Sequence, residues 1–195
     1  MDNKIELIKK IKKDCFNCKT CDIGKNLVLD QKDPHVFASG ELGAKVVVVA
    51  QNPGKEEVNK KLPLIGPSGK NLNALLGLAG LKRKEIYITN TVKCFTPQNR
   101  APFPAEIKAC KDFLKRELEA IKPRLILALG NYAVKYFVKK GGVLSLHGTI
   151  IHSDEFNVDV FVTLHPSPMN YNRDTSKKVL LEDFTKLKEI LQNYK

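Results

Sequence analysis

The sequence predicts an α/β protein, a three-layer α/β/α sandwich around a central, mainly parallel sheet of four strands. Short apolar runs rich in β-branched residues, such as 46–49, carry no polar alternation, which is typical of strands buried on both faces. Segments with helical periodicity separate these runs, and strands that alternate with helices form parallel sheets covered on both sides. With 195 residues, 43% of them hydrophobic, the chain can build one core, so we expect a single domain over 1–195.

The expected elements alternate along the chain. A proline in the first helical turn at 104 and glycines after 79 and 140 mark helix boundaries. Strands are expected at 45–50, 85–90 and 123–130, β segments around 149–152 and 158–164, helices at 5–13, 70–80, 104–121, 131–140 and about 177–193, and loops at 54–69 and 91–103.

Charge favours a polyanionic partner. The chain carries 33 basic and 21 acidic residues, a net charge of +12, which favours nucleic acid first and an anionic membrane second. No apolar run reaches the length of a membrane span, and the first 14 residues lack the apolar block of a secretory signal. We therefore expect a cytoplasmic monomer without a membrane segment, whose five cysteines are not a disulfide framework.

Polar residues stand where three of the expected strands end. Gln51 and Asn52 follow the first strand, Asn90 ends the second, and His165 follows the last. In open α/β sheets, ligands bind just beyond the carboxyl ends of the strands. These side chains are therefore candidates for one common site.

The cysteines have the spacing of a thiolate site. Cys15, Cys18 and Cys21 form two overlapping C-x-x-C pairs, while Cys94 and Cys110 stand alone. A C-x-x-C pair closed by two distant cysteines suits either Zn²⁺ or a [4Fe–4S] cluster, and the spacing does not choose between them. The alternative is buried cysteine without a ligand.

Five stretches carry a combined signature: "AQNPGKEE", "LPLIGPSGKNLNALL", "YITNTVKCFTPQNRAP", "PAEIKACKDFL" and "LHPSPMN". Together they resemble the uracil-DNA glycosylase superfamily, and most closely its family 4, the iron–sulfur enzymes of thermophilic archaea and bacteria. The resemblance covers nearly the whole chain. It implies an α/β/α sandwich, a [4Fe–4S] cluster and excision of uracil from DNA.

The resemblance also implies a ligand set for the cluster. Cys94 and Cys110 match two ligands of the family. The stretch "CKTCDIGKN" favours Cys18 and Cys21 as the other two, with Cys15 competing for one of these places.

Roles at the strand ends follow from the same resemblance. Asn52 matches the residue that positions the attacking water, His165 the histidine that hydrogen-bonds O2 of the base, and Asn90 the amide that reads the Watson–Crick edge of uracil. Family 4 has a small residue at the position of Asn52 and a glutamate at the position of Gln51. We expect Gln51 to contact the substrate. An amide orients water but is a poor base, so catalysis would rest more on stabilising the leaving group.

Further matched positions lie in the loops. Glu57 matches an acid that closes the pocket near C5 of the base, and Leu64 replaces a phenylalanine that stacks on uracil. Ser68 and the amide of Gly69 are candidates for phosphate contacts at a helix start. Candidates for the wedge that fills the gap left by the flipped base are Met169 and Tyr171.

The reaction expected is removal of uracil without strand cleavage, because no lysine occupies a matched catalytic position, although Lys55 and Lys70 lie nearby. Two alternatives stay open. The substitution at Leu64 leaves room for another base, such as hypoxanthine or thymine. The chain can also be a non-catalytic iron–sulfur module that senses DNA damage or carries electrons.

Overall fold

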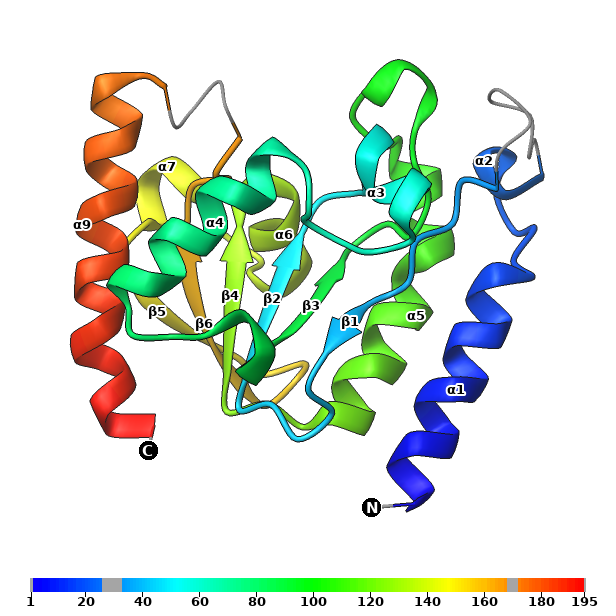
Figure 1. Cartoon of the computed structure of the whole chain (residues 1–195), viewed down its shortest axis with the longest axis horizontal. Coiled ribbons are helices and arrows are strands. Elements are labelled where there is room, and N and C mark those ends of the chain that lie inside the picture. Colours follow the sequence, from blue (N-terminus) through cyan, green and yellow to red (C-terminus); the bar gives the residue numbers. More distant parts are fainter. Residues whose placement is uncertain (1, 26–32, 168–171, 195) are drawn as a thin grey trace.

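The computed structural model describes residues 2–25, 33–167 and 172–194, and its centre is one mixed sheet (Figure 1). The strand order is β1-β3-β2-β4-β6-β5, in which the four inner strands are parallel and each edge strand is antiparallel to its neighbour. The strands are β1 (Ser39–Gly40), β2 (Val46–Ala50), β3 (Tyr87–Asn90), β4 (Leu125–Leu129), β5 (Ile150–Ser153) and β6 (Val158–Thr163).

The expected four-stranded sheet is therefore the parallel centre of a six-stranded one. β5 was expected as a β segment and forms one edge. β1, at the other edge, is only two residues long, so it leaves no hydrophobic pattern by which a sequence could reveal it.

Helices cover both faces of the sheet, which confirms the α/β/α layers (Figure 1). One face packs against α1, α5 and α6, and the other against α4 and α9. The helices are α1 (Asp2–Phe16), α2 (Asp22–Lys25), α3 (Lys55–Lys60), α4 (Pro67–Leu78), α5 (Pro104–Ile121), α6 (Gly130–Phe137), α7 (Val143–Leu146) and α9 (Asp174–Ile190), with 3-10 turns η1 (Arg83–Glu85), η2 (Pro97–Asn99) and η3 (Leu191–Tyr194). Among the helices described, none is both long and apolar enough to cross a membrane.

β2 explains why the apolar runs have no polar alternation. Val47 and Val49 belong to the core beneath α1 and α5, whereas Val46 and Val48 belong to the core beneath α4 and α9. Successive side chains of a strand point to opposite faces. Because both faces are covered by helices, every position of β2 is buried.

The segment 54–69, expected as a loop, contains α3 and the first turn of α4. α3 has six residues and no apolar stripe, so hydrophobic periodicity does not reveal it. A local capping interaction stabilises its start, since the backbone N–H of Gly54 donates to the Glu57 carboxylate over 3.1 Å. α4 begins with Pro67 at its first position, where the missing N–H costs nothing.

We expect Leu127→Ala, in the centre of β4, to lower the free energy of unfolding by about 2–5 kcal/mol, because it leaves a cavity in the core beneath α4 and α9. Leu127 is 0% exposed, whereas Leu144 is 80% exposed and provides a matched Leu→Ala control. Urea denaturation followed by circular dichroism measures both variants, and the control is expected to change by less than about 0.5 kcal/mol. Equal losses in the two variants would contradict the assigned core.

Candidate active site

The polar strand ends meet in one cavity. It has a volume of about 580 Å³ and lies beyond the carboxyl ends of β2, β3 and β6. Seven of the expected site residues line it, together with residues that the sequence did not single out for this site. The lining residues are Gln51, Asn52, Gly54, Lys55, Glu56, Glu57, Leu64, Pro67, Ser68, Asn90, Asn99, His165 and Ser167.

Three expected residues are not in this lining. Gly69 is buried inside α4, and a Cβ added there would lie 1.8 Å from the carbonyl oxygen of Leu64. This close approach leaves no room for a side chain at position 69. Leu64 lines the cavity and has a left-handed backbone conformation, with φ of 49°. Met169 and Tyr171 lie outside the described residues.

Backbone contacts hold the ends of β2 and β3 side by side. Ala50 and Asn90 are register partners at the end of the parallel ladder. Beyond the ladder, the Thr91 hydroxyl donates to the Gln51 carbonyl over 2.7 Å, and the Thr91 N–H donates to the Ala50 carbonyl over 2.8 Å. The side chains that follow β2 and end β3 are therefore presented to the same space.

The amide nitrogen of Asn52 is engaged by the protein. Nδ2 donates to the Pro53 carbonyl over 3.1 Å and to the Thr96 hydroxyl over 3.3 Å. Both hydrogen bonds use the nitrogen, so the side-chain oxygen Oδ1 is the atom with which Asn52 can accept from a bound molecule. Thr96, absent from the sequence-based site, therefore sets the orientation of this amide.

Asn90 presents a buried acceptor to the cavity. The residue is 2% exposed, and within the described part of the chain its Oδ1 has no hydrogen-bond partner. Leaving a buried polar atom unsatisfied costs about 1–3 kcal/mol. A ligand with an N–H group would remove this cost.

His165 is held neutral. Desolvation lowers the pKa of its imidazole to about 4, and the charge of Glu57 opposes this shift without cancelling it. At neutral pH the ring therefore has one N–H donor and no charge. Gly130, at the end of β4, supports it from behind, because a Cβ added there would lie 2.9 Å from the Cβ of His165. Gly130 also has φ of 79°, so glycine is needed twice over, although the sequence alone does not indicate this role.

Glu57 clamps two loops of the cavity wall. One carboxylate oxygen accepts the backbone N–H groups of Ile65 and Gly66 over 2.9 and 2.7 Å, and the other accepts that of Gly54. Glu57 therefore fixes the loop after β2 against the loop before α4. The sequence did not predict this role in joining the loops. The resemblance had matched Glu57 only to an acid that closes the pocket near C5 of the base.

All five cysteines surround a second, small cavity between the N-terminal segment and α5. Burial raises the pKa of Cys110 to about 12, and it also raises the pKa values of Cys15 and Cys94. As free thiols these three would stay protonated at neutral pH, so they are not activated nucleophiles. Cys18 and Cys21 are half-buried.

A buried histidine that the sequence did not single out holds the cysteine segments together. His35 pairs with Cys94 in an isolated β-bridge, and its Nε2 lies 3.2 Å from the Cys18 carbonyl oxygen. Its Nδ1 lies 2.5 Å from a carboxylate oxygen of Asp33. Over the residues described, no three His, Cys, Asp or Glu side chains are grouped so as to hold a single metal ion.

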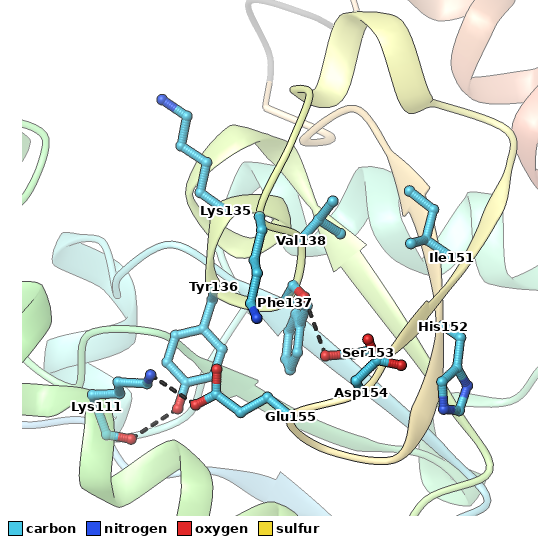
Figure 2. Close-up of a pocket in the computed structure, with 11 residues that line it drawn as sticks. Lys111, Lys135, Tyr136, Phe137, Val138, Ile151, His152, Ser153, Asp154 and Glu155 are labelled. Carbon is cyan, nitrogen blue, oxygen red and sulfur yellow. Dashed lines mark hydrogen bonds and ion pairs between the residues drawn. The ribbon is translucent and has the colours of Figure 1, made fainter.

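Figure 2 shows another cavity, of about 270 Å³, between α5, α6 and β5. Several of its polar groups are already engaged with one another. Lys111 forms an ion pair of 2.8 Å with Glu155, and the Tyr136 hydroxyl donates to the Lys111 carbonyl over 2.8 Å. We assign no ligand to it.

The low pKa of His165 predicts its titration. The imidazole should stay neutral from pH 7 down to about pH 4, whereas the exposed His152, whose pKa is raised by its hydrogen bond to Asp159, should protonate first. Long-range ¹H–¹⁵N NMR spectra over this range follow both rings. Between pH 6.5 and about 4, His165 is protonated in the unfolded chain but neutral in the folded protein. The free energy of unfolding should therefore fall as the pH drops from 6.5 towards 4. Protonation of His165 at or above the ordinary histidine value would contradict the assigned environment.

Comparison with known proteins shows the family of the chain. Residues 37–188 match the family model described as the uracil DNA glycosylase superfamily. The chain is 32% identical to a type-4 uracil-DNA glycosylase of Archaeoglobus fulgidus over 95% of its own length and 94% of the relative, and 34% identical to that of Thermotoga maritima over 98% of both chains. The solution NMR structure of a candidate uracil DNA glycosylase from Methanosarcina acetivorans has the same fold, with a TM-score of 0.52 at 15% identity over 79% of this chain and 97% of the other. The chain belongs to the uracil DNA glycosylase superfamily.

Proposed function

We propose that this protein is a DNA glycosylase that hydrolyses the N-glycosidic bond of uracil in DNA and leaves an abasic site. The observation that carries the proposal is the convergence of Asn52, Asn90 and His165, from three strand ends, on one cavity. Relatives named type-4 uracil-DNA glycosylases match nearly the whole chain, which supports the same substrate. We further propose that the chain acts as a single-domain monomer.

Asn90 would read the base. Its buried Oδ1 would accept from N3–H of uracil, and its amide nitrogen would donate to O4. Cytosine presents the opposite pattern at these two positions, so it would leave both amide atoms facing like partners. The base must leave the helix to reach the cavity, as in other enzymes that act on single bases.

His165 and Asn52 would divide the chemistry. Cleavage builds oxocarbenium character on the sugar and negative charge on the departing base. A neutral His165 would donate its N–H to O2 of that base, and Oδ1 of Asn52 would orient the attacking water. Because an amide is a poor base, stabilisation of the leaving anion would supply most of the acceleration.

DNA contacts would surround the cavity. Ser68 lies in the first turn of α4 and lines the cavity, where its hydroxyl can approach a phosphate, whereas Gly69 is buried inside the helix. The net charge of +12 favours the polyanion. Gln51, Glu57 and Leu64 would form the wall around the base. Met169 and Tyr171 remain the candidates for the wedge.

The cysteine pocket would hold a [4Fe–4S] cluster through Cys18, Cys21, Cys94 and Cys110, with Cys15 competing for one place. Four thiol donors around one cavity suit this group. Zn²⁺ is the alternative, because thiolates are ligands for both groups. When bound, it would tie the N-terminal segment to the core.

We expect the purified protein to release uracil from a single-stranded or duplex oligonucleotide in single-turnover assays. His165→Ala should lower the rate by about 10²–10³-fold, the usual effect of removing one donor to a developing anion. His152→Ala, at an exposed site outside the cavity lining, is the matched control and should keep the rate. Strand breaks that form without alkali would contradict a monofunctional reaction and direct attention to Lys55, which lines the cavity.

A second candidate is a glycosylase for another base. Leu64 provides no aromatic face for stacking, which is worth about 1–3 kcal/mol per base, so the cavity depends less on one base shape. A panel of uracil, thymine, hypoxanthine and xanthine substrates decides between the two. Activity on none of them, with DNA binding retained, would favour the non-catalytic module.

Metal analysis tests the cofactor. We expect a brown protein containing iron and inorganic sulfide, and loss of both in Cys94→Ser and Cys110→Ser. Comparison of Cys15→Ser with Cys21→Ser identifies the competing ligand, because the non-ligand variant keeps its iron. A colourless protein with one bound zinc would contradict the iron–sulfur assignment.

A further inference from the structure

Lys93 is buried between the active-site cavity and the cysteine pocket. Lys93 is 1% exposed, and its ammonium lies 2.7 Å from a carboxylate oxygen of Glu117, which is 0% exposed. Buried ion pairs contribute little to stability compared with apolar residues of similar volume, because both charges must lose their water. A role other than stability is therefore needed to explain the pair.

The ammonium forms two hydrogen bonds in addition to the ion pair. Besides Glu117, it donates to the Thr89 hydroxyl over 2.5 Å and to the backbone carbonyl of Asn90 over 2.8 Å. These last two partners are the final residues of β3. Lys93 thus holds the backbone of Asn90, whose side-chain oxygen lies at the active-site cavity and has no partner among the described residues.

The same lysine reaches the cysteine pocket. Its backbone N–H donates to Sγ of Cys110 over 3.2 Å, and Lys93 is itself part of the pocket lining. Cys110 and Glu117 both belong to α5, so this helix supplies a contact to each end of the lysine. One residue therefore connects the cysteine pocket to the base-reading end of β3.

We propose that Lys93 is a positioning residue for base recognition, which fixes Asn90 so that its side-chain oxygen meets the base, and which makes this geometry depend on the cysteine pocket. The inference rests on the proposed function. Its consequence is specific: loss of the ammonium weakens recognition of the extruded base and leaves general attraction to DNA unchanged.

Three variants separate positioning from folding. Lys93→Met removes the ammonium but strands a buried carboxylate, which can unfold the protein. The double variant Lys93→Met/Glu117→Met removes both charges and keeps an apolar core of similar volume. Lys111→Met/Glu155→Met is the matched control, because it removes an ion pair of 2.8 Å that lies outside the linings of the active-site and cysteine cavities.

Binding is measured by fluorescence anisotropy with two duplexes of the same sequence. One contains 2′-fluoro-2′-deoxyuridine, whose glycosidic bond resists hydrolysis, and the other contains cytidine at that position. Thermal unfolding and iron content are recorded for each protein. The ratio of the two affinities reports base recognition, and a purely structural role would not change it.

We expect the double variant to lose about tenfold of the wild-type preference for the uracil analogue, as for loss of one hydrogen bond to the base, with unchanged affinity for the cytidine duplex. The control Lys111→Met/Glu155→Met should keep the preference. An undiminished preference in the double variant, or an equal loss of affinity for both duplexes, overturns the inference alone. A wild-type protein that shows no preference overturns the proposed function and this inference with it.

Discussion

The arrangement of the site depends on the position of β2. This strand is hydrogen-bonded to β3 on one edge and to β4 on the other, and both of its faces are buried. It cannot shift by one residue, because a shift would exchange the side chains of its two cores. The most constrained strand of the sheet therefore fixes the backbone position of the residues that follow it, including Asn52.

The second constraint is electrostatic. Close to the strand ends, the cavity wall combines a desolvated neutral imidazole with a carboxylate saturated by backbone N–H groups. Those donors bind the Glu57 carboxylate and align two loops at the same time. The Glu57 carboxylate raises the pKa of His165, but burial of the ring lowers it by more, so the imidazole stays neutral.

The sequence was most informative where burial is continuous. The runs around β2, β4 and β6 predicted the parallel centre, and their polar ends predicted the residues that now line one cavity. The edge strand β1 and the helix α3 are too short to leave a periodic pattern. Gly130, Thr96 and His35 were missed for a different reason: each acts through a neighbour distant in the chain, by close approach or by a single hydrogen bond. Contacts of this kind are created by the tertiary structure, and local composition does not encode them.

The five cysteines differ in exposure, and this has a consequence for ageing of the protein. Cys94 and Cys110 are shielded by the core, whereas Cys18 and Cys21 are half-buried in the segment that follows α1. Oxidants and chelators would therefore reach the cysteine pocket first at Cys18 and Cys21, because the susceptibility of a thiol follows its accessibility. Damage there would loosen the segment after α1 before it disturbed the sheet, because α1 itself is held by Ile8 and Ile11 in the core. An inactivated molecule would therefore first become vulnerable to proteases in the segment that carries Cys18 and Cys21.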